Sequence, residues 1–193
     1  GDTNAWEYLG YFIAQNLQLT PFPTLDFHSD QTFYPYGTSH VFQSWGLERD
    51  MFYAFAFTYL GVGPWLQIYY LLSLFITGIG AFLLLRKEYH FYSVLLFSFI
   101  ITLGNLYALA KYPHHLNIAV YHWTALSLIV DFLLVKHVWH RQVISLHFIL
   151  LRLILLMLSL GLELGYIAGY SLLSGVLTVS FVSVMSFVRR PPA

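Results

Sequence analysis

Carboxylates and imidazoles gather in the first third of this chain, which otherwise carries few charges. Charged residues make up 9% of the 193 residues, yet the segment before residue 64 holds a dense set of acids and histidines: Asp2, Glu7, Asp26, His28, Asp30, His40, Glu48 and Asp50. Above a bilayer, a carboxylate could take a proton from a substrate hydroxyl, and several could hold a divalent metal ion. The simpler alternative is that a segment outside the membrane must be polar and that its acids are only solvated.

A second polar group lies within AKYPHHLNIAVYHW, residues 110–123. Its members are Lys111, His114, His115, Asn117 and His122. Imidazole is the commonest nitrogen ligand of metals, although the spacing is not that of an HExxH motif. Alternatively, Lys111 or a protonated His114 could bind the phosphate group of a lipid-linked substrate. The sequence leaves both uses open.

Three further ionisable residues fall inside apolar stretches, and one falls between two of them. Asp131, His147 and Arg152 would lie within the membrane, where charges are costly and normally paired. They could form a proton relay or an interhelical polar clamp, and we favour the clamp, with Asp131 and His147 at similar depth and Arg152 further in. Glu163, in the turn LGLELGY, could instead line the same outer cavity as Asp2.

Composition explains why these residues must be positioned by membrane helices. The chain is 58% hydrophobic and 19% aromatic, whereas a soluble domain carries about 25% charged residues. The formal net charge of zero gives no basic patch for nucleic acid, and the absence of cysteine excludes disulfides, thiolate catalysis and cysteine-ligated zinc. We therefore expect a polytopic membrane protein.

Five stretches are apolar over the roughly 20 residues that a membrane span needs. They are Trp65–Leu85, Phe91–Ala110, Leu116–Val135, Val143–Leu160 and Tyr166–Val188. Basic pairs follow the first, third and fifth stretches: Arg86 with Lys87, Lys136 with Arg141, and Arg189 with Arg190. By the positive-inside rule that side is cytoplasmic. The expected fold is an all-α membrane helix bundle over residues 64–190, with residues 1–63 as an extracytoplasmic loop.

The outer segment contains helix signals of its own. Apolar residues from Trp6 to Leu17 recur at helical spacing, with Thr3 or Asn4 as an N-cap, and predict an amphipathic helix on the membrane surface. Met51–Leu60 is too short to span and predicts an interfacial or re-entrant helix. Because an outer segment must be translocated, we expect a removed signal peptide or a further helix ahead of Gly1.

The order of three motifs carries a resemblance to a known superfamily. GD precedes the amphipathic segment, FYPYG follows in the outer loop, and HHLNIAVYHWTAL opens a later apolar stretch. This order resembles the GT-C superfamily of integral-membrane glycosyltransferases. It is most similar to a bacterial branch often labelled as pyruvoyl-tetrahydropterin-synthase-related membrane proteins, and it covers Gly1 to about Arg141.

The resemblance implies a function and a set of site residues. It implies transfer of a sugar from a polyprenyl-phosphate donor to an acceptor hydroxyl, in the inner membrane of a bacterium. It further implies a general base in the first outer loop and cations that neutralise the phosphate leaving group. The residues so indicated are Asp2 and Glu7 for catalysis, and Lys111, His114, His115, Asn117 and Glu163 for substrate binding. No cofactor is indicated beyond a divalent metal ion, which stays open.

Two other classes of protein compete with this interpretation. A non-catalytic subunit of a larger membrane complex would use its aromatic and leucine-rich faces to bind partner helices. A transporter would place its coupling acids at mid-depth between repeats, and no repeat is visible. Convergence of the predicted site residues on one outer cavity beside a lateral opening would favour the enzyme, and a closed cavity would favour the subunit.

Overall fold

The computed structural model describes residues 2–30, 35–41, 46–163 and 165–188; the side chains of Asp2, Thr3, Asn117, Gly165 and Tyr166 are outside this description. Arg189, Arg190 and part of the FYPYG motif also lie outside the described residues. Within them, the chain forms the helices α1 (Asp2–Asn16), α2 (Leu47–Leu60), α3 (Trp65–Leu85), α4 (Phe91–Thr102), α5 (Leu106–Lys111), α6 (Leu116–Ala119), α7 (His122–Trp139), α8 (Leu146–Leu162) and α9 (Gly165–Val188).

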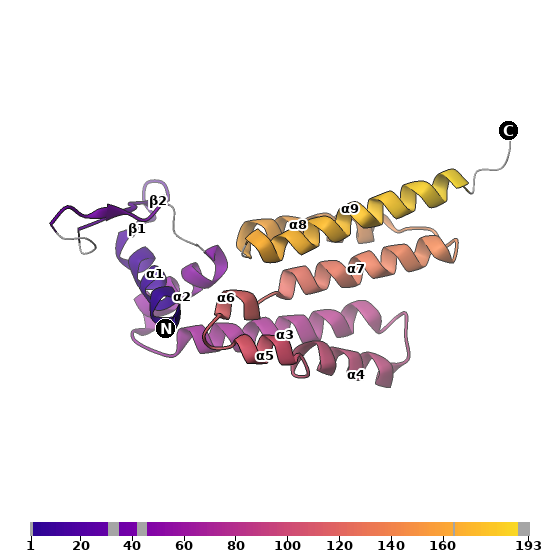
Figure 1. The fold of residues 1–193 in the computed structure, drawn as a ribbon, viewed down its shortest axis with the longest axis horizontal. Coiled ribbons are helices and arrows are strands. Elements are labelled where there is room, and N and C mark those ends of the chain that lie inside the picture. The colour runs from indigo at the N-terminus through magenta and orange to yellow at the C-terminus, as the bar shows by residue number, and fades with distance from the viewer. Residues whose placement is uncertain (1, 31–34, 42–45, 164, 189–193) are drawn as a thin grey trace.

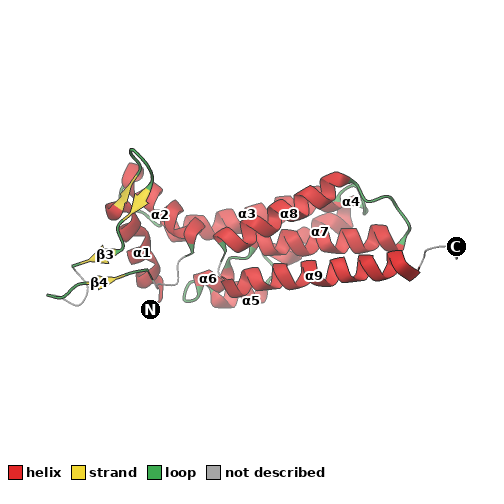
Figure 2. Ribbon diagram, turned by 90° about the horizontal axis from the view of Figure 1, so that it is seen from above, coloured by secondary structure: helices red, strands yellow, loops and turns green. Residues whose placement is uncertain are grey.

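The helices form an elongated bundle with a separate cap at one end (Figure 1). Helices α3, α4, α7, α8 and α9 run along the long axis, and α1 and α2 lie across one end of them (Figures 1 and 2). We call this the α1–α2 end; it also holds α5, α6 and the adjoining ends of α8 and α9. The opposite end, which we call the basic end, holds the α3–α4 and α7–α8 turns. Their sequences carry Arg86, Lys87 and Arg141, next to Lys136 in the last turn of α7.

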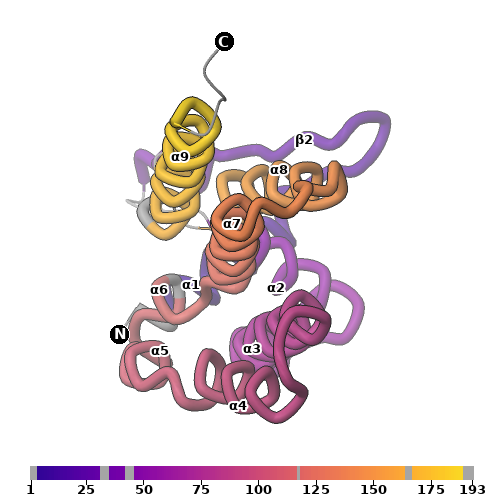
Figure 3. Tube along the Cα trace, turned by 90° about the vertical axis from the view of Figure 1, so that its right-hand side faces the viewer, coloured from indigo at the N-terminus to yellow at the C-terminus, as the bar shows by residue number. Residues whose placement is uncertain are grey.

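Helix α7 is the centre of the bundle. It packs against α3, α8 and α9 and appears between them in the end-on view (Figure 3). Its buried side chains, among them Ile129, Val130 and Leu133, form one hydrophobic core with Ala81 of α3 and Leu155 of α8. Helix α4 instead packs on α3. This arrangement places the polar residues of α7 between the two halves of the bundle.

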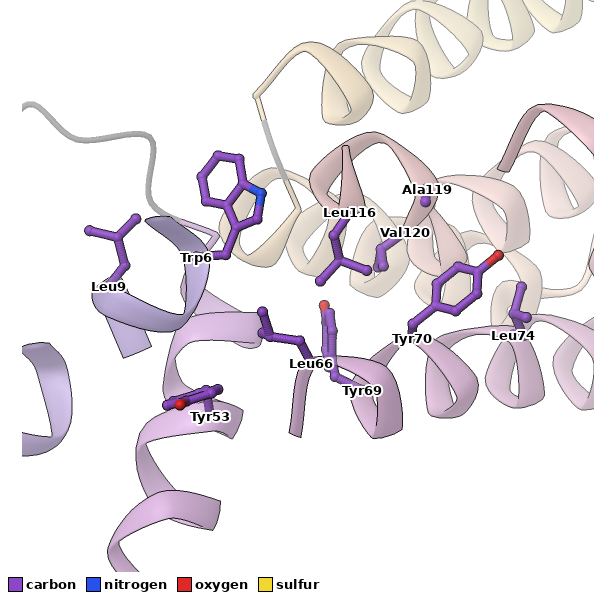
Figure 4. Close-up of a cluster of buried hydrophobic side chains, with 10 residues drawn as sticks. All are labelled: Trp6, Leu9, Tyr53, Leu66, Tyr69, Tyr70, Leu74, Leu116, Ala119 and Val120. Atoms are coloured by element: carbon purple, nitrogen blue, oxygen red, sulfur yellow. The ribbon is translucent and has the colours of Figure 1, made fainter. Parts of the chain in front are cut away.

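A second hydrophobic core joins the cap to the bundle (Figure 4). It contains Trp6 and Leu9 of α1, with side chains from α2, α3, α6 and the residue after α6: Tyr53, Leu66, Tyr69, Tyr70, Leu74, Leu116, Ala119 and Val120. At Gly10, an added Cβ would lie 2.5 Å from Cδ1 of Tyr53, so only glycine allows α1 to approach α2 this closely. The apolar face of α1 is thus covered by protein, while the location of the helix at a membrane surface stays a prediction.

Three helices are long and apolar enough to cross a membrane, judged by length and composition over the described residues. They are Trp65–Leu85, Phe91–Lys111 and Ile167–Val188, while Leu146–Leu162 is apolar but shorter. The chain is therefore a mostly helical protein with the character of a membrane protein. The expected span from Leu116 to Val135 is not one of the three: the chain breaks after α6, and α7, which begins at His122, carries Asp131 and Lys136.

Two features of the fold depart from an uninterrupted helical pattern. Short antiparallel ribbons follow α1: β1 (Leu17–Gln18) pairs with β2 (Thr24–Leu25), and β3 (His28–Ser29) pairs with β4 (Thr38–Ser39).

The second expected span is interrupted before α5, where the Asn105 side chain accepts a hydrogen bond from Ala108 N and donates one to the hydroxyl of Tyr121. That hydroxyl also donates to the carbonyl oxygen of Ile101, at 2.9 Å.

Candidate functional site

Glu48 is the centre of a polar cluster at the α1–α2 end. It lies in the first turn of α2, and its carboxylate accepts hydrogen bonds from Tyr69 Oη (3.4 Å) and Trp123 Nε1 (3.0 Å). His122 Nε2 lies 3.2 Å from Oε2 of the same carboxylate. The three partners come from α3 and from the start of α7, so the folded bundle, and not the local sequence, assembles this contact.

The environment of Glu48 favours the ionised carboxylate. Burial, the largest influence, acts to raise the pKa of Glu48, but the hydrogen bond and charge of His122, with the hydrogen bonds of Trp123 and Tyr69, outweigh it and lower the pKa. The side chain remains 22% exposed, whereas that of His122 is fully buried. Within the described residues, Nδ1 of His122 has no hydrogen-bond partner. Glu48 is therefore a charged, held carboxylate that solvent can still reach.

Glu163 caps the start of α7. Its carboxylate accepts hydrogen bonds from Trp123 N (2.8 Å) and Thr124 N (3.1 Å), two amides in the first turn of a helix that have no partner within it. The hydroxyls of Thr124 (2.5 Å) and Ser159 (3.0 Å) donate to it as well. Burial raises the pKa of Glu163, although the hydrogen bond of Thr124 and the charge of His122 act against it. The residue thus holds the first turn of α7, which carries His122 and Trp123.

A buried arginine completes the cluster. Arg49 is only 3% exposed; its guanidinium lies 4.3 Å from the ring centre of Trp6 and donates to Asp50 at 2.7 Å. Asp50 in turn accepts from Gly46 N at 2.9 Å. A small cavity lies between Arg49, Tyr69 and Glu163; it measures about 20 Å³, and its other lining residues are Gly46, Leu116, Val120 and Leu162. That volume is about the size of one water molecule.

An apolar groove of about 570 Å³ runs between α4 and α7 and begins beside this cluster. We call it the α4–α7 groove. Its lining residues are Leu85, Tyr89, Ser93, Val94, Phe97, Ile101, Tyr121, Thr124, Ala125, Leu128, Ile129 and Phe132. From Tyr121 to Phe132 it follows α7 for about 16 Å at the helical rise per residue. Thr124 both lines the groove and donates to Glu163, so the groove and the polar cluster share a wall.

The structure describes the side chains of five of the seven residues that the sequence predicted for the site. Glu163 alone among them is shown within the buried cluster. Glu7 is half-buried on α1, and His114 and His115 are exposed between α5 and α6. Lys111 ends α5, with its amino group 5.7 Å from the ring centre of Tyr107. The side chains of Asp2 and Asn117 lie outside the described residues.

Glu48 belongs to the first polar group of the sequence and His122 to the second, and nothing in the sequence pairs the two residues. They are 74 residues apart, and Tyr69, Trp123 and Arg49 have no local signal that could connect them to the site. No group of three or more histidine, cysteine or acidic side chains that could hold a metal ion occurs in the part of the chain that the structure describes. The described residues therefore provide no set of ligands for the divalent metal ion that the sequence left open.

The predicted clamp inside the bundle is present between two of its three residues. Arg152 of α8 donates to both carboxylate oxygens of Asp131 of α7, at 2.7 and 2.9 Å. It also donates to the carbonyl oxygen of Ser171 on α9, at 2.5 Å. His147 is not part of this clamp; it is exposed at the start of α8 and lies 3.2 Å from the hydroxyl of Ser145.

No family model, curated protein or solved structure matches the chain. The function must therefore be inferred from the polar cluster, the adjoining groove and the arrangement of the ends.

Proposed function

We propose that this protein transfers a sugar from a polyprenyl-phosphate donor to an acceptor hydroxyl at the α1–α2 end. The observation that carries the proposal is the position of Glu48. It is an ionised, partly exposed carboxylate, braced by Tyr69, His122 and Trp123. Thr124, the next residue along α7, lines the apolar groove of the bundle. Chemistry on a lipid-linked substrate needs both a polar reacting site and an apolar path for the lipid chain.

Glu48 takes the part of the general base. A sugar hydroxyl is a poor nucleophile, and a carboxylate within hydrogen-bond reach accelerates its attack by accepting its proton. As the acceptor oxygen bonds to the anomeric carbon, the bond from that carbon to the donor phosphate breaks. The proton goes to Glu48, and the polyprenyl phosphate leaves with the bonding electron pair. His122 and Trp123 hold the carboxylate in place, and Glu163 acts on it only through them.

The donor is held by two features on either side of the cluster. Its chain lies in the α4–α7 groove, which is lined almost entirely by apolar side chains. Its phosphate lies towards the segment from α5 to α6, where Lys111, His114 and His115 supply cationic or imidazole groups. Asn117 lies in that segment too. Neutralising the phosphate stabilises the charge that develops as it leaves.

A second candidate function rests on the closure of the cavity. At about 20 Å³ it has no room for a sugar, and both oxygens of Glu163 are used by α7. A non-catalytic subunit of a larger membrane complex would keep such a cluster only to fix its fold. Transfer therefore requires an opening at Glu48, on the exposed side of the carboxylate.

A transfer assay separates the two functions. The protein, reconstituted in liposomes, is supplied with polyprenyl phosphates that carry radiolabelled hexoses or pentoses, and transfer to an added glycan or lipid acceptor is counted. Glu48→Gln should slow transfer by about 10²-fold or more. Asp30→Asn is the matched acid-to-amide control, because that side chain is 86% exposed and pairs with His28, which is not a residue of the cluster around Glu48.

Asp2→Asn and Glu7→Gln test the base that the resemblance implies. Loss of transfer in Asp2→Asn, with full activity in Glu48→Gln, would move the base to Asp2 and leave the transferase standing. Absence of transfer and of donor binding for every donor in the wild-type protein would favour the accessory subunit.

A further inference from the structure

A second apolar groove lies between α3 and α4, on residues of α4 other than those that line the α4–α7 groove. It measures about 520 Å³, and its lining residues are Leu71, Leu74, Phe75, Gly78, Ile79, Phe82, Phe91, Leu95, Ser98, Phe99, Thr102 and Leu103. From Leu71 to Phe82 it follows α3 for about 16 Å. We call it the α3–α4 groove.

The groove is open towards the surroundings and closed at its floor. Phe75 is 64% exposed and Leu95 50%, so its two walls face outward. At its floor, a Cβ added to Gly78 would lie 3.2 Å from Cγ2 of Thr102, which shows how closely the two helices approach there. The Thr102 hydroxyl donates to the carbonyl oxygen of Ser98 at 2.7 Å. The groove thus lies on the outer surface of two helices that are apolar enough to lie in a membrane.

One end of the groove meets a turn with net positive charge. Phe82 and Phe91 line that end, and the turn between α3 and α4 carries the exposed basic residues Arg86 and Lys87. The one acid of the turn, Glu88, is neutralised by Lys136, with Nζ to Oε2 at 2.9 Å, and lies 3.4 Å from His137 Nε2.

Neither Arg86 nor Lys87 forms an ion pair within the described residues, so both are available to an anion. At the other end of the groove, the basic residue nearest in sequence to Leu103 is Lys111. The cation of Lys111 is packed over Tyr107. Arg86 and Lys87, at the basic end, are therefore the basic residues nearest in sequence to the lining of the groove.

We propose that the α3–α4 groove and the turn after α3 form a binding site for one anionic phospholipid of the leaflet at the basic end. One acyl chain lies along the groove, and the headgroup phosphate lies against Arg86 and Lys87. Attraction of an anionic leaflet to a basic residue near its surface corresponds to about a fivefold preference per residue. A zwitterionic lipid would fill the groove equally well but would gain little from the turn.

The absence of cysteine allows the site to be measured directly. Leu95→Cys, in the groove, carries a fluorophore, and its quenching by brominated acyl chains is compared for phosphatidylglycerol and phosphatidylcholine. Leu150→Cys is the matched control: each residue is the fifth of its helix from the basic end, and the exposures are 50% and 48%, but Leu150 lines neither the α3–α4 groove nor the α4–α7 groove. We expect phosphatidylglycerol to be preferred about fivefold or more at residue 95 and much less at residue 150.

The charge requirement is tested in the same labelled protein. Arg86→Gln with Lys87→Gln should remove the preference at residue 95, whereas Arg141→Gln, at the other turn of the basic end, should leave it. Because the fluorophore itself could fill the groove, native mass spectrometry of the unlabelled protein counts the phosphatidylglycerol molecules retained with and without the double substitution. Equal quenching by both lipids, equal preference at residues 95 and 150, or a preference and retention that survive the double substitution would overturn the proposal.

Discussion

Two polar groups in this bundle contain similar chemistry but are built differently. In the middle of the bundle, Asp131 and Arg152 form a bidentate ion pair, and the carbonyl oxygen of Ser171 accepts a further hydrogen bond from the arginine. At the α1–α2 end, Glu48 is held by one donor each from Tyr69, His122 and Trp123. We call these the mid-bundle pair and the end cluster.

The two groups differ in the balance of their charges and in the access of solvent to their side chains. In the mid-bundle pair a buried acid faces a buried base, so the charges cancel within three helices. In the end cluster, Glu48 stays 22% exposed and has no arginine or lysine as its direct partner among the described residues. A buried and fully paired group has no free valence for a substrate, whereas a charged group that solvent can reach is available for chemistry. The comparison thus favours the end cluster over the mid-bundle pair as the site of the proposed function.

Arg152→Met should produce the largest loss of stability, because it leaves the carboxylate of Asp131 buried without its partner. Removing one partner of a buried ion pair costs about 3–5 kcal/mol. The free energy of unfolding in detergent micelles, followed by circular dichroism, measures the loss.

The double variant Asp131→Leu/Arg152→Met sharpens the comparison. Replacing both partners of a buried pair by apolar residues is often close to neutral, so the double variant should recover most of the stability that the single variant loses. A double variant as unstable as Arg152→Met would mean that the pair itself, and not the stranded charge, holds α7 to α8.

Gly175→Ala should have the next largest effect, again through Arg152. A Cβ at residue 175 would lie 2.7 Å from Nη2 of Arg152, which Asp131 and Ser171 hold in place. Overpacking of this kind costs about 1–3 kcal/mol. Gly169→Ala, on the same helix, is the matched control: nothing lies within 4 Å of its added Cβ, so it should be neutral or stabilise by up to about 1 kcal/mol. Equal effects at the two glycines would show that the arginine can move.

Glu163→Ala should be milder, since it removes a helix cap and breaks no ion pair. Loss of a cap costs about 0.5–2 kcal/mol, and Glu163→Gln, which keeps an oxygen for the amides of Trp123 and Thr124, should lose less. Thermal unfolding of the two variants measures the difference. If Glu163 only positions His122 and Trp123, transfer by the Gln variant should stay within a few-fold of wild type, whereas transfer by Glu48→Gln should not.

The sequence predicted the elements of the bundle because membrane helices have a strong and local signal. The first expected span, Trp65–Leu85, has the bounds of α3, and the last differs from α9 by one residue. The breaks before α5 and α7 were missed. They depend on Asn105 and Tyr121, whose side chains meet across 16 residues of chain. The two short ribbons are too small to leave a period in the sequence.

The site was less accessible to sequence reasoning than the fold. Burial separates Asp131 and Arg152 from solvent, so the expectation that they pair follows from the cost of an isolated charge in a membrane. Glu48 carries no such constraint, because an acid in a polar loop can always be solvated. Only the packing of α2 against α3 and of α7 against both α3 and α8 brings its partners to it.

The smallest expected effect is a difference in pH dependence between two variants of the end cluster. The pKa of Glu48 is lowered, so its contribution to stability is present above its unfolded value of 4.5 and is lost as the pH falls below it. The pKa of Glu163 is raised, so its contribution has the opposite sign: it is present below 4.5 and is lost as the pH rises through the folded value.

Glu163→Gln keeps only the Glu48 contribution, and Glu48→Gln keeps only that of Glu163. Every other acid is common to both variants and cancels in the comparison. On going from about pH 7 to about pH 4, the melting temperature of Glu163→Gln should therefore fall further than that of Glu48→Gln. Parallel melting curves would mean that Glu48 is not held in its ionised form by the cluster, and the case for it as the base would lose its electrostatic support.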